Sequence, residues 1–332
     1  MYIEFYNFSE KPFDITSNPR FLFFTPVYKE VLASLIYGIQ ERRGILAIFG
    51  EVGTGKTTLL KAAVEHLKDT THFAFIFNTD ADFSEQLELV AEEFELMSPL
   101  VNISTSRRIN KLKKYAEFKA EKKENVVIII DEAQNLDYEV FESWRLLSNL
   151  ESEAGKLIQI VFSGQPELEK KLKEYRLRQL DQRISHRQYI KTLNMEETFN
   201  YVKHRLKIAG GAENIFNDNS LKLVWYYSQG VPRKINILCD NVLLIGFALG
   251  KKKITEEITR EAIEDLTRSP FLDPPGEKKS SLPIAAQTPS AKNSHNPDGP
   301  IKGTYNRFRV TLAAGFFICI AVAAGIYFYI VL

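Results

Sequence analysis

Four short runs of consecutive apolar residues recur in the first half of the chain. They are 44–50 (GILAIFG), 72–78 (HFAFIFN), 125–131 (NVVIIID) and 157–164 (LIQIVFSG). Runs of this kind are typical of strands that are buried on both faces of a parallel sheet. Stretches with helical spacing of apolar residues separate the runs. The pattern therefore predicts an α/β fold with a parallel, doubly wound sheet over residues 44–190.

After residue 193 the apolar positions follow a helical period alone. Helices are expected at 195–210, 219–229, 232–250 and 255–267. Asn194 can cap the first of these helices, because Glu197 follows three residues later in the pattern of a capping box. We therefore predict a core domain over residues 1–193 and a small all-α domain over residues 194–268.

The two ends of the chain differ in composition from these domains. Residues 1–40 are rich in aromatic side chains and are interrupted by Pro12, Pro19 and Pro26. Residues 269–308 are rich in proline and polar residues and have few large apolar ones. Such a segment buries too little apolar surface to fold, so we expect a flexible linker there.

The segment 310–332 contains 23 residues and no charge. At a rise of about 1.5 Å per residue, a helix of this length spans the roughly 30 Å of a bilayer's hydrocarbon core. Lys302, Arg307 and Arg309 precede it and no charged residue follows it, so the positive-inside rule places the preceding domains in the cytoplasm. The alternative, a helix buried in a soluble core, would need a partner surface.

Composition excludes several classes of protein. The 43 basic and 42 acidic residues give a net charge of +1, which provides no overall attraction to nucleic acid or anionic lipid. The two cysteines, Cys239 and Cys319, lie in different segments, so no disulfide framework is expected. Five scattered histidines without cysteine spacing argue against a structural zinc site.

Residues 50–57 match the phosphate-binding pattern GxxxxGK[ST] in full, between a predicted strand and a predicted helix. The glycines let the backbone approach phosphate, and the helix N-terminus favours negative charge. Lys56 would reach the β- and γ-phosphates of ATP, and Thr57 would ligate Mg²⁺. The candidate nucleotide-contacting residues of this loop are Gly50, Glu51, Val52, Gly53, Thr54, Gly55, Lys56, Thr57 and Thr58.

An acidic pair, Asp131 and Glu132, follows the third apolar run. The carboxyl ends of parallel strands meet at the ligand-binding edge of such sheets, so this pair should face the loop above. Asp131 would then hold Mg²⁺ and Glu132 would polarise the attacking water. At the end of the fourth run, Ser163 or Gln165 is a candidate sensor of the γ-phosphate; a plain strand and turn explains these two residues equally well.

Three arginines are candidates for stabilising phosphate charge: Arg178, Arg183 and Arg233. Arg233 is the strongest of them, because Pro232 marks a helix start and presents its neighbour in the first helical turn. A solvated side chain is the ordinary alternative for each arginine.

The ordered motifs EKPF, GEVGTGKTTL, IIIDEAQNL, FSGQPEL and GVPRKINILCD closely resemble the general secretion pathway A-type AAA+ ATPases. Related ATPases occur in pilus biogenesis and exosortase systems. The resemblance spans roughly residues 1–268. It implies a P-loop AAA+ core with a helical lid, in which residues 50–57 are Walker A and Asp131–Glu132 are Walker B. Secretion members typically continue into a periplasmic peptidoglycan-binding region, which is not found after residue 332, so direct cell-wall binding is not expected.

The resemblance also suggests roles for individual residues. Sensor 1 would lie near Ser163–Gln165, and Arg233 would contact the γ-phosphate from the lid. Arg178 or Arg183 would reach into a neighbouring subunit. Asn78 resembles the polar residue that restrains the catalytic glutamate in many AAA+ proteins. The N-terminal aromatic segment would lie near the adenine, although simple packing against the core explains it equally well.

Together these features predict a membrane-anchored ATPase of the bacterial inner membrane that drives or regulates an envelope assembly system for secretion, pilus formation or polysaccharide export. Expected partners are copies of itself in an AAA+ oligomer such as a hexamer, membrane proteins of that system, and the bilayer. One alternative is a DNA-handling helper, supported by the basic stretch 106–123; a solvated helix face explains that stretch better, and nucleic acid is not an expected partner. Another is a nucleotide-dependent scaffold with little hydrolysis.

Overall fold

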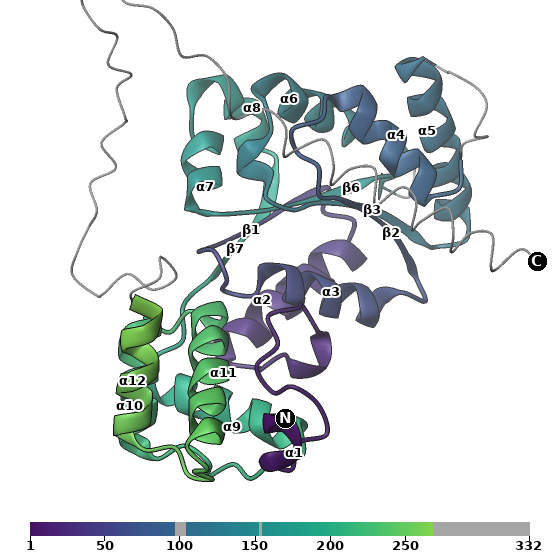
Figure 1. Cartoon of the computed structure of the whole chain (residues 1–332). Helices are drawn as coiled ribbons and strands as arrows, with labels where there is room; N and C mark the ends of the chain where they lie inside the picture. The colour runs from purple at the N-terminus through teal and green to yellow at the C-terminus, as the bar shows by residue number, and fades with distance from the viewer. Residues whose placement is uncertain (97–103, 153–154, 268–332) are drawn as a thin grey trace, which may run out of the picture. The chain divides into compact units, whose positions relative to one another are not determined.

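The computed structural model describes residues 1–96, 104–152 and 155–267, which fold around a parallel sheet (Figure 1). The sheet has five strands in the order β2-β3-β6-β1-β7, and every neighbouring pair is parallel. The strands are β1 (Ile45–Gly50), β2 (Thr71–Ile76), β3 (Asn125–Ile130), β6 (Gln159–Gly164) and β7 (Ile184–Ile190). The α/β fold and the four strands predicted from apolar runs are confirmed.

The fifth strand, β7, was not predicted. Its sequence, ISHRQYI, has polar residues at its centre, and only Ile184 and Ile190 are buried. This strand lies at the edge of the sheet beside β1, and the side chains between those two isoleucines are exposed or only partly buried. β7 therefore lacks the continuous apolar run from which the other four strands were predicted.

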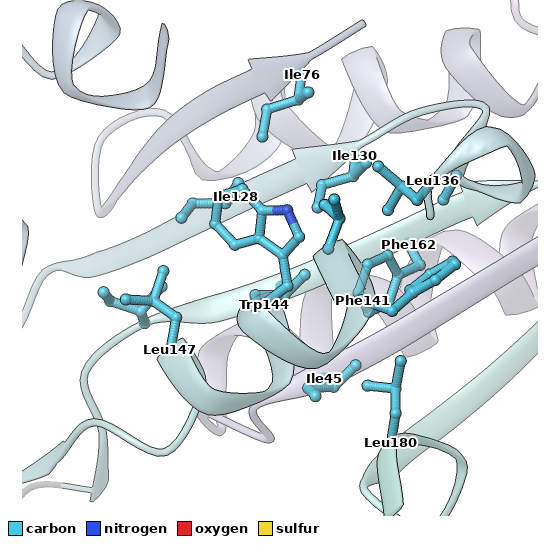
Figure 2. Packing of buried hydrophobic residues seen from close by; sticks show 14 of the residues in the cluster. Ile45, Ile76, Ile128, Ile130, Leu136, Phe141, Trp144, Leu147, Phe162 and Leu180 are labelled. Carbon is cyan, nitrogen blue, oxygen red and sulfur yellow. The ribbon is translucent and has the colours of Figure 1, made fainter. Parts of the chain in front are cut away.

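Helices cover both faces of the sheet (Figure 1). Because side chains alternate along each strand, Leu46 and Ile48 of β1 pack under α2 and α3, while Ile45 and Phe49 pack under the helices of the other face. Trp144 of α6 is fully buried in the apolar cluster on the same face as Ile45 and Phe49 (Figure 2). The helices of the core are α2 (Pro26–Gln40), α3 (Lys56–Leu67), α4 (Phe83–Glu93), α5 (Thr105–Glu121), α6 (Tyr138–Leu147), α7 (Pro166–Leu172) and α8 (Arg178–Asp181).

Short elements complete the core. They are the 3₁₀ turns η1 (Pro19–Phe21), η2 (Ala133–Asn135) and η3 (Tyr175–Leu177) and the two-stranded pair β4 (Glu151–Ser152) and β5 (Gly155–Lys156). Pro26, which the sequence pattern treats as an interruption, instead opens α2. The side chain of Thr25 caps this helix by accepting a hydrogen bond from the backbone N–H of Tyr28.

Within the described residues up to 267, four helices follow β7, as the sequence predicts for this part of the chain, and we call them the lid. They are α9 (Met195–Ile208), α10 (Asp218–Ser228), α11 (Pro232–Ala248) and α12 (Glu256–Thr267). Asn194 and Glu197 form the expected capping box at the start of α9. Pro232 is at the first position of α11, which places Arg233 in its first turn.

The N-terminal residues pack with the lid, although the sequence assigns them to the core. α1 (Tyr2–Phe5), Phe8 and Phe13 share one apolar cluster with the lid helices. The backbone N–H of Ser9 donates to the carbonyl of Ala209. The chain therefore begins on the lid, and its first contacts with the core include those of Ser17 and Leu22.

The predicted linker, 269–308, and the predicted membrane helix, 310–332, lie outside the described residues. Among residues 1–96, 104–152 and 155–267, no helix combines the length and apolar character needed to cross a membrane. The membrane helix therefore stays a prediction from sequence.

Candidate functional site

The loop between β1 and α3 places a buried lysine at the N-terminus of a helix. Lys56 is the first residue of α3, and its ammonium donates hydrogen bonds to the carbonyls of Gly50 at 2.9 Å and Glu51 at 3.3 Å. Burial lowers the pKa of Lys56, while the carboxylates of Glu132 and Asp131 act in the opposite direction. A buried cation beside free helix N–H groups is suited to bind phosphate.

N-terminal residues hold this loop in place. The hydroxyl of buried Tyr28 donates to the carbonyl of Thr54, and the hydroxyl of Thr54 donates to the carbonyl of Glu51 at 2.8 Å. Ser17 and Thr58 share a hydrogen bond of 2.9 Å between their hydroxyls. Nothing in the sequence marks Ser17 or Tyr28 as part of the site, since no local pattern links them to a loop that follows 26 or more residues later.

Asp131 joins the loop to the sheet. It follows β3 and is buried. Its carboxylate accepts hydrogen bonds from Thr57 Oγ1 at 2.5 Å and Ser163 Oγ at 2.7 Å. Thr57 and Asp131 supply adjacent hard oxygen donors, as Mg²⁺ requires, so these residues fit a magnesium site next to the loop.

Glu132 projects from the same strand end and has an unusual backbone, with φ of +51°. Its Oε2 atom accepts hydrogen bonds from the side-chain amides of Gln134 at 2.7 Å and Gln165 at 2.9 Å. Burial alone would raise the pKa of this carboxyl, but the two amides and the charge of Lys56 together hold the pKa below its usual value. Glu132 is therefore ionised at neutral pH, as a general base must be.

A pocket of about 290 Å³ lies between the loop, the N-terminal segment and the lid. Its volume is close to the lower limit for small-molecule sites. Its lining comprises residues 15–18, 21–23, 28, 52–58, 132, 193, 201, 205, 232, 233 and 236. The lid contacts the loop directly here, because the backbone N–H of Arg233 donates to the carbonyl of Gly53 at 3.1 Å. The exposed side chain of Arg233 thus lies at the pocket, on the lid side.

The remaining candidates lie outside this pocket. Arg178 is exposed and stacks on the ring of Tyr175 at 3.9 Å, and Arg183 precedes β7 and is also exposed. The side chain of Asn78 is exposed after β2, and the described contacts of Glu132 are with Gln134 and Gln165 instead. The roles predicted for Asn78, Arg178 and Arg183 therefore stay predictions. The contact of Gln134 with Glu132 has no signal in the sequence that would have predicted it.

Comparison with known proteins agrees with this geometry. A family model described as an AAA domain matches residues 39–172. General secretion pathway protein A of Aeromonas hydrophila is 38% identical over 261 residues, which cover 76% of this chain and 46% of that protein. The chain thus spans about half the length of this relative.

Solved structures share the fold at low sequence identity. The Aeropyrum pernix ORC2 protein, in its ADPNP–ADP complexes, has a TM-score of 0.61 and 17% identity, covering 78% of this chain and 72% of its own. The Aeropyrum pernix ORC1 protein in complex with DNA has a TM-score of 0.55 and 13% identity, covering 75% and 67%. The sequence relationship, the fold and the geometry of the site all indicate the same protein family. The chain belongs to the AAA+ ATPases related to general secretion pathway protein A.

Proposed function

We propose that this protein binds and hydrolyses ATP to drive or regulate the assembly of a bacterial envelope system, and that it does so as an oligomer anchored in the inner membrane. A secretion system is the first candidate, since the curated relative is a general secretion pathway protein. The ADPNP and ADP complexes of the ORC2 protein support nucleotide as the ligand of this fold.

One observation carries the proposal. Lys56, Thr57, Asp131 and Glu132 meet at one end of the sheet, beside a pocket that Arg233 closes from the lid. A phosphate-binding loop alone would suffice for binding. The ionised Glu132, held by two amides at the edge of the same pocket, is the group that hydrolysis additionally requires.

Each residue then has a chemical task. Lys56 and the loop N–H groups bind the phosphates, and Thr57 and Asp131 would hold Mg²⁺, which neutralises phosphate charge when bound. Glu132 accepts a proton from the attacking water. Arg233 contacts the γ-phosphate from the lid. Arg178 or Arg183, both exposed outside the pocket, would complete the site of a neighbouring subunit.

The DNA-handling alternative gains little from the structure. It rests on the basic residues of α5, but Arg108 is buried and paired with Glu88 at 2.7 Å. Lys119 pairs with Glu124 at 2.9 Å. The likeness to the DNA complex of the ORC1 protein shows the fold alone. A helix whose cations are partly neutralised offers a weak phosphate-binding surface.

The hydrolysis test uses the full chain in detergent micelles with ATP and Mg²⁺. We expect the rate per subunit to rise several-fold with protein concentration, because a neighbouring subunit supplies an arginine. Steady-state phosphate release measures this rate. Arg178→Ala and Arg183→Ala identify the arginine, since the correct variant should bind ATP normally and lose the rise. A negligible hydrolysis rate that does not depend on protein concentration, despite tight ATP binding, would instead favour the alternative of a nucleotide-dependent scaffold with little hydrolysis.

The membrane anchor is tested separately. Two lysines placed within the predicted span, Ile320→Lys and Ala323→Lys, should remove the protein from the carbonate-resistant membrane fraction. Each lysine raises the free energy of membrane insertion by about 2.5–3.5 kcal/mol when it lies at the centre of a membrane helix. Ala285→Lys with Ala286→Lys in the predicted linker is the matched control and should stay membrane-bound. Equal fractionation of both variants would contradict the anchor.

A further inference from the structure

Gln134 makes hydrogen bonds with both ends of its side-chain amide at the catalytic carboxylate. Its Nε2 donates to Glu132 Oε2 at 2.7 Å, and its Oε1 accepts from the backbone N–H of Gln165 at 3.1 Å. The side chain of Gln165 donates to the same Oε2 atom at 2.9 Å. These three residues form a closed network in which no amide group of Gln134 is unpaired.

The network fixes the direction of the carboxylate. Both amide donors contact Oε2, and within the described part of the chain no donor contacts Oε1. A carboxylate that is hydrogen-bonded through one oxygen keeps its other oxygen available as an acceptor. The orientation of Glu132 around its own side-chain bonds is therefore set by Gln134 and Gln165.

The surroundings are shaped to seat the Gln134 amide. A Cβ atom at Gly164 would lie 2.7 Å from Gln134 Oε1, so the glycine leaves the space that the amide fills. Lys171 of α7 donates hydrogen bonds to the backbone carbonyls of Gln134 at 3.1 Å and Leu136 at 2.5 Å. The turn η2 is thereby fastened to a helix of the core.

The backbone conformation of Glu132 is one that needs stabilising contacts. Its φ of +51° is in the left-handed region, which a glutamate rarely adopts. Such a conformation persists only where neighbouring contacts enforce it, and it is found most often at functional sites. Gln134, two residues farther along the same turn, is the nearest contact in sequence that can hold the side chain of Glu132.

We propose that Gln134 is a positioning residue for ATP hydrolysis, which directs the free oxygen of Glu132 toward the attacking water. Gln165 is the second residue that holds the carboxylate of Glu132 by a hydrogen bond. The inference rests on the proposed function, because it assigns Glu132 as the base. It adds a residue that acts through Glu132 and that is not among the residues lining the pocket.

Two substitutions in the full chain test the proposal. Gln134→Met keeps the length and bulk of the side chain and removes both hydrogen bonds. Gln134→Glu keeps an acceptor for the N–H of Gln165 but places a second carboxylate against Glu132. We expect kcat to fall about 10²-fold in both, as for a catalytic group displaced by about 1 Å. The KM and Kd for ATP should stay within about twofold, because the phosphate-binding residues are untouched.

Gln40→Ala, at the exposed end of α2, is the control and should leave kcat unchanged. Crystal structures of the wild-type protein and Gln134→Met with a non-hydrolysable ATP analogue give a second readout. The carboxylate of Glu132 should lose its hydrogen bond to Gln165 in the variant. An unchanged kcat with an unmoved carboxylate would overturn the proposal, as would a rise in KM that accounts for the whole loss of rate.

Failure of the proposed function has a different signature. It would appear as a wild-type chain without turnover above that of Glu132→Gln. In that case the crystallographic comparison alone decides whether Gln134 orients Glu132: a moved carboxylate supports the positioning role, and an unmoved one contradicts it.

Discussion

Replacing Glu132 by glutamine should reduce ATP hydrolysis about 10²–10⁴-fold and leave ATP binding intact. This is the usual contribution of a general base, and it corresponds to roughly 3–5 kcal/mol of activation free energy. The substitution keeps the size of the side chain and removes its ability to accept a proton. Binding should survive because Lys56, Thr57 and Asp131, which would contact the phosphates and the metal, do not hydrogen-bond to the side chain of Glu132. Phosphate release and the Kd of a fluorescent ATP analogue measure the two effects.

The matched control is Glu139→Gln, an identical change at an exposed position in the first turn of α6. It should leave both rate and affinity unchanged. If Glu132→Gln hydrolysed ATP within about tenfold of the wild-type rate, Glu132 would not be the base. If it lost ATP binding as well, the variant would be reporting a damaged pocket.

Sequence located the phosphate-binding loop and the acidic pair because both depend on short-range patterns. A glycine-rich loop between a strand and a helix defines its own geometry. Asp131 and Glu132 end a continuous apolar strand, and all parallel strands deliver their carboxyl ends to one edge. The hydrogen bond between Thr57 and Asp131, which are 74 residues apart, follows from that rule.

The N-terminal contribution to the site was not predictable in the same way. Arg205 of α9 is buried, and its guanidinium donates hydrogen bonds to the carbonyls of Pro12 at 2.5 Å and Asp14 at 3.1 Å. These groups are more than 190 residues apart in sequence. No local pattern encodes such a contact, because it depends on the lid and the first residues folding together. The resemblance to a family suggested only that this segment lies near the adenine.

The role that we propose for Gln134 could not be predicted from the sequence for a different reason. A glutamine after an acidic pair has no periodicity or spacing that marks it. Its position depends on the left-handed backbone of Glu132 and on the space left by Gly164, and both are properties of the folded chain. Arg178 and Arg183 are a third case, since the role predicted for one of them, contact with the site of a neighbouring subunit, would be visible only in an assembly.

Gly230→Ala should both destabilise the protein and weaken nucleotide binding. A Cβ atom at Gly230 would approach the carbonyl oxygen of Leu193 far inside the 3.0 Å below which such contacts essentially do not occur. Leu193 cannot move away freely, because its N–H donates to the carbonyl of Gly230 at 2.8 Å and its side chain is buried. We expect a loss of about 3–5 kcal/mol in the free energy of unfolding, the size typical of severe local strain.

The effect on binding follows from what comes next in the chain. Gly230 precedes Val231, Pro232 and Arg233, and the N–H of Arg233 is the lid's hydrogen bond to the loop at Gly53. A displaced Gly230 shifts the start of α11, so Arg233 and Pro232 leave their places in the pocket lining. The Kd for ATP should therefore rise at temperatures where the variant is still folded, as judged by circular dichroism.

Gly250→Ala separates the clash from the backbone effect. Gly250 has φ of +66°, close to the +69° of Gly230, but among the described residues no atom beyond its two chain neighbours lies within 4 Å of an added Cβ. Alanine there should cost only the roughly 1–2 kcal/mol of a left-handed residue and should not change ATP affinity. If both variants lost the same stability and bound ATP equally well, contact between Gly230 and Leu193 would not govern the position of Arg233. The lid would then be held at the pocket by the N-terminal segment, through contacts such as that of Arg205 with Pro12.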